Sequence, residues 1–284
     1  RVCRRVLYWM CVGLRKCSGM KSELNLSEIK NFWQRRADKF GTATAASWAD
    51  SPMVELEVKN IARYLKLGDR VLDVGCANGH TAMALAKTLD ISVHGVDYIE
   101  GMIVSANQAL QQHNDLDGRV SFACADVLAS LNNLDGFDVA YTVRVLINLE
   151  TIENQKKAIR NICQTVRPGG KVLFSEATVN GWVKLNKFRA EWGLSGIPIK
   201  PFNLYIEEEM VFECLPDECT LELIEPFSSS YYVGTRVFKP LLAACNGIDI
   251  DVSNAEMEFN KFFAACPPIG DYAVQKLFVV SREA

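Results

Sequence analysis

Three absences narrow the kinds of protein that this sequence of 284 residues can encode. It has no run of 18 apolar residues, so we predict no membrane-spanning helix. Its net charge is −3, and this balance does not indicate a nucleic-acid partner. Its ten cysteines include no C-x-x-C pair, and no spacing of Cys and His fits zinc, so we predict no metal site.

The composition of the chain and its first 19 residues indicate a coarse division into domains. The hydrophobic fraction of 49% is sufficient for one large domain, or for a core with a cap. Cysteines without a pairing pattern indicate reduced thiols, and we expect a cytoplasmic protein. Residues 1–19 contain five basic residues and no acid, and Met20 follows them. We interpret residues 1–19 as a leader outside the fold, with an organelle-targeting segment as the alternative.

The strongest signal lies at residues 71–79, where an apolar strand passes through Asp73 into a glycine-bearing loop and then a helix. Such a turn brings the backbone close to a nucleotide-like ligand in α/β proteins. A dinucleotide fingerprint would need glycine where Ala77 and His80 stand. The helix dipole would attract a pyrophosphate, but the Asp73 carboxylate would repel it. The turn therefore favours a ligand that carries a positive charge.

Two more acids end the next two predicted strands. Asp97 closes the strand over residues 91–97, and Asp126 follows the strand over residues 120–125. An acid about 20 residues past the glycine loop is placed to bind ribose hydroxyls. Each acid alone could simply cap a helix, because Asp is a good N-cap. Three acids at successive strand ends favour a binding site over three separate caps.

The loop resembles motif I of the class I SAM-dependent methyltransferases (SAM, S-adenosylmethionine), usually acid-x-Gly-x-Gly-x-Gly, with Ala77 at the middle glycine. The resemblance covers about residues 53–180 and includes a Pro-Gly-Gly turn at residues 168–170. It implies SAM as the cofactor, with Asp97 on the ribose, Met102 beside the adenine and Asp126 reading the adenine amino group. The implied cofactor-binding residues are Asp73, Gly75, Cys76, Ala77, Gly79, Asp97, Tyr98, Met102, Asp126, Val127 and Thr142.

The predicted fold is a doubly wound, Rossmann-like α/β fold with seven strands and a mostly helical lid. The resemblance implies that the last strand is antiparallel. We expect lid helices over residues 20–69, the first one capped by Ser27 and the second starting at Ser51. The remaining predicted parts are the SAM-binding core over 70–178, a lid insertion over 179–218, and C-terminal strands over 219–284 that enclose a lid segment over 237–268.

Arg144 is the first candidate for the chemistry. It follows the predicted strand over residues 137–142, at the edge of the sheet where the methyl group would be transferred. An arginine in an apolar segment needs a partner. That partner is either an internal acid such as Glu176 or an anionic group of the substrate. No histidine stands out as a general base.

A second cluster, residues 228–237, combines hydroxyl groups with two tyrosines and an arginine. The candidate catalytic residues are Arg144, Glu176, Tyr231, Tyr232 and Arg236. We predict methyl transfer to an oxygen of a small hydroxylated metabolite or sugar, anionic if the two arginines bind it. The alternatives are N-methylation of a small amine held by aromatic side chains, or a non-catalytic SAM-binding regulatory protein.

Overall fold

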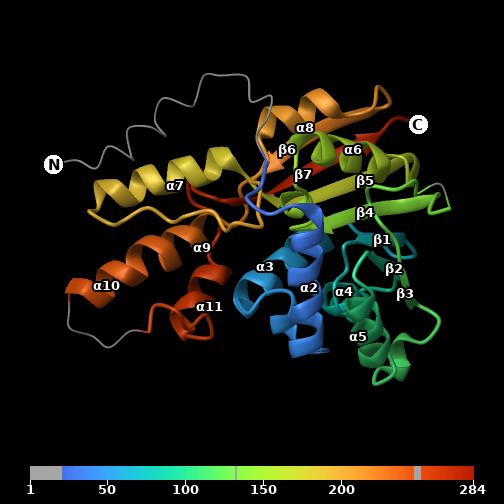
Figure 1. The fold of residues 1–284 in the computed structure, drawn as a ribbon, viewed down its shortest axis with the longest axis horizontal. Helices are drawn as coiled ribbons and strands as arrows, with labels where there is room; N and C mark the ends of the chain where they lie inside the picture. The colour runs from blue at the N-terminus through green and yellow to red at the C-terminus, as the bar shows by residue number, and fades with distance from the viewer. Residues whose placement is uncertain (1–20, 132, 246–250) are drawn as a thin grey trace.

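The computed structural model describes residues 21–131, 133–245 and 251–284, so the leader expected over residues 1–19 lies outside the described residues. A seven-stranded sheet with the order β3-β2-β1-β4-β5-β7-β6 forms the centre (Figure 1). β1 to β5 are parallel, and β7 lies antiparallel between β5 and β6. The predicted fold class is confirmed. The strands are β1 Arg70–Val74, β2 Ser92–Asp97, β3 Val120–Cys124, β4 Phe137–Val143, β5 Val166–Ala177, β6 Cys219–Glu225 and β7 Gln275–Arg282.

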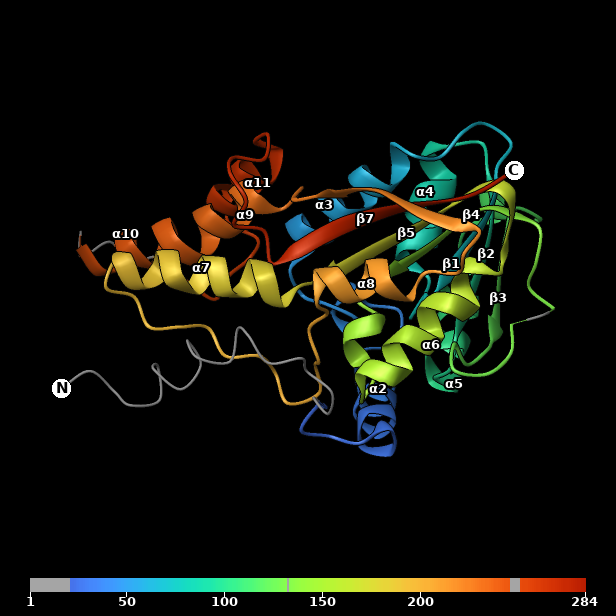
Figure 2. The ribbon, with the colours of Figure 1, turned by 90° about the horizontal axis from the view of Figure 1, so that it is seen from above.

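Helices cover both faces of the sheet and extend beyond it on one side (Figures 1 and 2). The central strands are apolar because both of their faces are covered, and Leu72, Ala140 and Phe174 are fully buried. The helices are α2 Leu26–Phe40, α3 Ser51–Ala62, α4 His80–Thr88, α5 Glu100–Leu110, α6 Ile152–Cys163, α7 Val179–Glu191, α8 Glu208–Cys214, α9 Ser229–Val233, α10 Lys239–Cys245 and α11 Glu258–Ala265.

The segments expected to form a lid lie in three separate parts of the chain. α2 and α3 precede the sheet, α7 and α8 follow β5, and α9, α10 and α11 lie between β6 and β7. Both views place α7, α9, α10 and α11 together at one end of the molecule (Figures 1 and 2). Among the helices of the described ranges, none is long and apolar enough to cross a membrane.

The first helix begins two residues earlier than the sequence analysis predicts. Asn25, not Ser27, is its N-cap: the Asn25 side chain accepts the Glu28 N–H at 3.0 Å, and the Glu28 carboxylate accepts the Asn25 N–H at 2.9 Å. This reciprocal capping box satisfies two backbone donors, whereas Ser27 has no such acid three residues ahead. The second helix starts at Ser51 as predicted, with proline in its first turn.

The Pro-Gly-Gly segment at residues 168–170 lies inside the bounds of β5 and not before the strand. The pairing with β4 jumps from Phe137–Val166 to Val139–Lys171, so the segment bulges out of the ladder. Gly169 has a φ of 77°, a left-handed conformation that glycine adopts without strain. The predicted turn is therefore present as a bulge that aligns the rest of β5.

Candidate functional site

The loop after β1 is shaped by three left-handed residues, Gly75 (φ 75°), Ala77 (φ 47°) and Gly79 (φ 77°). A Cβ on Gly75 would lie 2.3 Å from Val145 Cγ2, and one on Gly79 would lie 2.4 Å from Phe122 Cζ. Glycine is therefore required at both positions for space as well as for conformation. Ala77 adopts the left-handed conformation although it has a side chain, which costs about 1–2 kcal/mol.

Asp97 at the end of β2 supports this loop. One carboxylate oxygen accepts the Ala77 N–H at 3.0 Å, and the other accepts the Ile99 N–H at 2.9 Å. Burial raises the pKa of Asp97 to about 6, against the effect of these hydrogen bonds. Each oxygen keeps a lone pair, and the residue lines a large cavity together with Tyr98 and Met102. The carboxylate is thus held in place for hydroxyl donors.

Asp126 follows β3 and lines the same cavity next to Val127. Its Oδ1 accepts the Leu128 N–H at 2.8 Å, and the residue is exposed. This contact fixes the turn and leaves the second carboxylate oxygen available to an amino group.

Asp73 lies deeper than the other two acids. It is only 2% exposed, and its Oδ2 has no hydrogen-bond partner within the described part of the chain. Burial raises the pKa of this carboxyl to about 7, although the buried Tyr141 hydroxyl beside it opposes this effect. Asp73 lines a small pocket together with Gly75 and Cys76. A buried oxygen without a partner is costly, so it fits a site that a positively charged ligand group completes.

The large cavity has a volume of about 790 Å³ and runs from the carboxyl ends of the strands into the lid. It shares five lining residues with the small pocket, so the two form one continuous site. Much of its remaining lining is aromatic and aliphatic, and the exposed Lys200 also lines it. The aromatic residues of this lining include Trp33, which packs against a buried cluster that contains Ile99 and Met102, and also Trp48, Trp182, Phe202, Tyr205 and Tyr232.

Two predicted cofactor residues do not line either pocket. Gly79 is the N-cap of α4, where the left-handed backbone opens the helix. Thr142 is fully buried, and its hydroxyl donates to Glu176 Oε1 at 2.8 Å. Both residues therefore support the structure around the cavity and do not line it.

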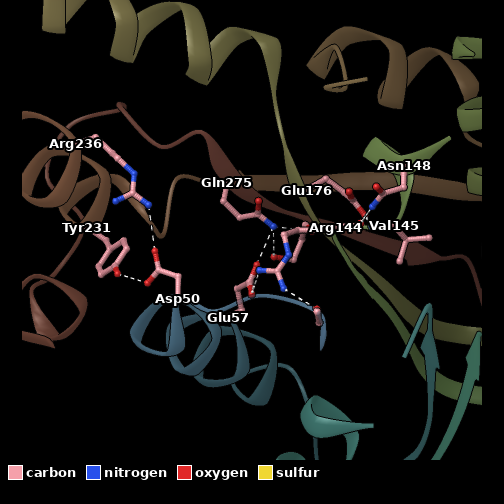
Figure 3. Close-up of polar contacts among 11 residues, drawn as sticks. Asp50, Glu57, Arg144, Val145, Asn148, Glu176, Tyr231, Arg236 and Gln275 are labelled. Atoms are coloured by element: carbon pink, nitrogen blue, oxygen red, sulfur yellow. Dashed lines mark hydrogen bonds and ion pairs between the residues drawn. The ribbon is translucent and has the colours of Figure 1, made fainter. Parts of the chain in front are cut away.

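Arg144 has an internal acid as its partner, but that acid is Glu57 of α3 and not Glu176 (Figure 3). Arg144 Nη1 lies 2.6 Å from Glu57 Oε2, and Glu57 Oε1 also accepts the Gln275 side-chain amide at 2.9 Å. Burial raises the pKa of Glu57 to about 7 although the arginine opposes this effect. Arg144 lines both pockets, and its guanidinium lies 4.1 Å from the Trp48 ring centre.

Glu176 accepts hydrogen bonds from the backbone of the loop after β4. One of its oxygens accepts the N–H groups of Val145 and Leu146 at 2.9 and 3.1 Å, and the other accepts that of Ile147 at 3.3 Å. Burial raises its pKa to about 7. It lines neither pocket, so among the catalytic candidates its visible role is to hold the loop after β4.

The second candidate cluster, residues 228–237, is also paired with a buried acid (Figure 3). Asp50 accepts a hydrogen bond from the Tyr231 hydroxyl and pairs with Arg236 at 3.1 Å. Tyr231 is buried away from the cavity, whereas Tyr232 and Arg236 line it. Burial raises the pKa of Tyr232, so this phenol stays protonated.

Three functional residues are absent from the sequence prediction: Asp50, Glu57 and Asn78. The Asn78 side chain donates to the carbonyls of Gly41 and Ala43 at 3.1 and 2.9 Å, which ties the glycine loop to the turn after α2. Glu57 had a detectable signal, because helical spacing from Met53 places it on the buried face of α3. Asp50 and Asn78 carried no comparable local signal.

Comparison with known proteins agrees with this geometry. Residues 65–194 match the family described as "Methyltransferase domain". Residues 65–194 therefore form a methyltransferase domain of the class I SAM-dependent type. It is 31% identical over 112 residues to 27-O-demethylrifamycin SV methyltransferase of Amycolatopsis mediterranei, covering 39% of this chain and 40% of that protein. It is 34% identical over 127 residues to ubiquinone biosynthesis O-methyltransferase of Coxiella burnetii, covering 44% and 50%. These alignments span at most half of either relative.

Solved structures resemble this chain over most of its length. Magnesium protoporphyrin IX methyltransferase from Synechocystis PCC 6803, with bound S-adenosylhomocysteine (SAH), has a TM-score of 0.57, 14% identity, and covers 90% of this chain and 99% of its own. Phosphoethanolamine N-methyltransferase 1 of Haemonchus contortus also has a TM-score of 0.57, with 15% identity and coverage of 93% and 50%. At these identities the likeness shows the fold.

The described residues fit the family's cofactor, SAM. Asp97 offers lone pairs to a ribose diol, and Asp126 offers one to an amino group. The unpaired oxygen of Asp73 suits the ammonium group of an amino acid. Met102 is 1% exposed and contributes an apolar wall for the adenine. These residues lie along one continuous site.

Proposed function

We propose that the protein transfers a methyl group from SAM to an oxygen of a small molecule with a largely apolar body and a hydroxyl group. The observation that carries this proposal is the single cavity whose lining combines two kinds of side chain. The acids Asp97 and Asp126 come from the ends of β2 and β3, and aromatic residues such as Trp182 and Tyr232 come from α7 and α9. Relatives named as O-methyltransferases favour oxygen as the acceptor atom.

The aromatic part of the lining favours a ring-shaped acceptor. Trp48, Trp182 and Tyr232 come from three different parts of the lid and all line the cavity. Flat apolar rings bind well between such side chains because they bury a large area with a specific geometry. A volume of about 790 Å³ is sufficient for a small organic acceptor beside the cofactor.

The paired arginines do not require the anionic sugar or metabolite expected from the sequence. Arg144 has Glu57 beside it, and Arg236 has Asp50, so each positive charge already has a buried carboxylate as a partner. Neither arginine therefore needs an anionic acceptor to balance its charge. Lys200 lines the cavity but is exposed to solvent.

Catalysis in this proposal rests on positioning. SAM supplies a methyl group that its sulfonium already activates. The chain has to align the acceptor oxygen with that methyl group and exclude water, which contributes about 7–11 kcal/mol in favourable cases. Among the described residues that line the large cavity there is no histidine or glutamate, and its two aspartates lie at the cofactor end. The acceptor's own acidity, as in a phenol or enol, then supports loss of the proton to water.

The test is methyl transfer from labelled SAM to a panel of hydroxylated aromatic rings, sugar acids and amines, with products identified by mass spectrometry. We expect O-methylated rings. Transfer to amines alone supports the N-methyltransferase alternative, and tight SAM binding without transfer supports a regulatory protein. Trp182→Ala should raise the acceptor KM by roughly tenfold or more, since aromatic contacts lose several kcal/mol on truncation. Trp192→Ala, on the exposed side of the same lid region, is the matched control.

A further inference from the structure

The small pocket next to the glycine loop contains one acid and one permanent positive charge. The acid is Asp73, with its unpaired buried oxygen, and the cation is Arg144. Apart from the exposed His80, the other residues that line this pocket are uncharged. An α-amino acid carries an ammonium and a carboxylate on the same carbon, and a pair of opposite charges in one pocket is its complement.

We propose that Arg144 binds the α-carboxylate of the methionyl part of SAM, while Asp73 takes the ammonium group. This inference rests on the proposed use of SAM and extends it to a residue that the sequence names as a catalytic candidate. It makes Arg144 a cofactor-binding residue that forms the wall between the cofactor and the acceptor.

The backbone and the guanidinium of Arg144 are both held in place. Its φ is 57°, its N–H donates to the Ser175 carbonyl at 2.9 Å, and its own carbonyl accepts the Asn148 side-chain amide at 2.6 Å. The guanidinium lies against the Trp48 ring. A fixed guanidinium loses little entropy when it binds a carboxylate, which favours tight and specific recognition.

Arg144 also has hydrogen-bond donors to spare. A guanidinium carries five N–H donors. Within the described part of the chain, one nitrogen donates to Glu57 at 2.6 Å and another to the Ser47 hydroxyl at 3.4 Å. The remaining donors are available to a carboxylate in the pocket that Arg144 lines together with Ser47.

The other cations of the large cavity are placed differently. Arg36 donates to the carbonyls of Ala45 and Ala46, and Lys30 lies 5.6 Å from the Tyr98 ring at the adenine end. Arg236 is held by Asp50 in the lid. Lys200 also lines the large cavity, and neither it nor any of these three lines the small pocket with Asp73. The ammonium and the carboxylate of an amino acid are attached to the same carbon, so a carboxylate whose ammonium binds Asp73 must lie in the same pocket. Arg144 lines that pocket and is therefore placed to bind the carboxylate.

The experiment compares two ligands by calorimetry. SAH contains the amino acid group, and 5′-methylthioadenosine retains the adenosine and the sulfur but lacks the amino acid. We expect Arg144→Met to weaken SAH binding by roughly ten- to a hundredfold, the effect of a lost hydrogen bond to a charged group, and to change methylthioadenosine binding by less than about twofold. Arg167→Met, which also loses an ion pair with an acid but lies at neither pocket, should leave SAH affinity unchanged.

Removing Arg144 leaves Glu57 without its partner, so the double variant Glu57→Gln with Arg144→Met is measured as well and should show the same ligand selectivity. An unchanged SAH affinity overturns the inference. An equal loss for both ligands also overturns it, because that loss would come from a distorted pocket. If neither ligand binds the unaltered protein, the proposed use of SAM fails instead.

Discussion

Arg144 and Glu57 form an ion pair with an N–O distance of 2.6 Å between the loop after β4 and helix α3. The Glu57 side chain is 1% exposed and that of Arg144 is 16% exposed. Because the two residues are 87 positions apart in the chain, the pair fastens the N-terminal part of the lid to the sheet at the site itself. Gln275 of β7 donates to the same carboxylate and adds a third element to this contact.

Breaking this pair from one side should destabilise the protein strongly. We expect Arg144→Met to lower the free energy of unfolding by about 3–5 kcal/mol, since it leaves a buried carboxylate without its partner. In a double-mutant cycle with Glu57→Gln, the coupling energy should be about 1–3 kcal/mol. Urea unfolding measures all four proteins. The same cycle on Arg63 and Glu225, a pair whose arginine is 56% exposed, should give less than about 1 kcal/mol.

Equal coupling energies in the two cycles would contradict this prediction. They would mean that Glu57 is already neutral in the folded protein and that its contact with Arg144 contributes no more than a surface pair. The pKa of about 7 for Glu57 makes that outcome testable. The coupling energy should then grow as the pH rises from 6 to 8, where the carboxyl becomes ionised.

The parts of the fold that sequence predicts well are those with local signals. Asp97 and Asp126 follow alternating apolar strands, and each lines the predicted cavity. The strand bounds are correct to within a few residues because buried parallel strands appear as short apolar runs between turns. Only the family resemblance predicts that β7 is antiparallel, since no local sequence pattern indicates the order of strands in a sheet.

The parts that sequence predicts poorly are pairs of charges that meet through tertiary structure. Arg144 needed a buried acid, and sequence order favoured Glu176 on the neighbouring strand. The actual partner, Glu57, lies on a helix before the sheet. Glu176 instead satisfies three backbone N–H groups, a role that no side-chain pattern reveals. Choosing between such acids requires the positions of α3 and the loop after β4.

Asp97 should be needed for the ribose of the cofactor. Because Asp97 accepts the N–H groups of both Ala77 and Ile99, an alanine there would disturb the glycine loop, and Asp97→Asn is the cleaner change. We expect Asp97→Asn to weaken SAH binding by about 1.5–3 kcal/mol, the contribution of one charged hydrogen bond. Calorimetry measures it. Asp69→Asn, in a turn where Asp69 accepts the Lys66 N–H, should bind SAH normally.

Equal SAH affinity in the Asp97→Asn variant and the unaltered protein would remove Asp97 from the cofactor site. A parallel loss of melting temperature and affinity would show that the substitution acts through the loop. Circular dichroism melts of both variants separate these outcomes.

Gly79 should tolerate no side chain. A Cβ at this position would lie 2.4 Å from the Phe122 ring, and φ is 77°. We expect Gly79→Ala to destabilise the protein by about 2–4 kcal/mol, the sum of backbone strain of about 1–2 kcal/mol and overpacking of about 1–3 kcal/mol. Gly68→Ala is the control, because Gly68 has a φ of 84° and nothing within 4 Å of its Cβ position. Similar losses at both positions would show that Phe122 moves aside.

Asp73 should make both stability and cofactor binding depend on pH. Burial raises its pKa from 3.8 to about 7, so the folded state holds this proton more tightly than the unfolded state does. Stability therefore falls as pH rises from about 4 to about 7, by up to about 4 kcal/mol for a shift of that size, and is constant above. The isosteric variant Asp73→Asn avoids this loss. Without ligand, it should be as stable as the unaltered protein near pH 4 and more stable at pH 8.

Ligand binding should show the opposite preference. The ammonium group of SAH needs the ionised carboxylate, so the unaltered protein should bind SAH more tightly at pH 8 than at pH 6, by roughly tenfold for one proton released near pH 7. Asp73→Asn should bind more weakly at pH 8 and lose most of this dependence. Glu57, Glu176 and Asp97 have pKa values of about 7, 7 and 6 and titrate in both proteins, so the difference between the two isolates Asp73. Identical pH profiles for the two proteins would show that no positive ligand group lies beside Asp73.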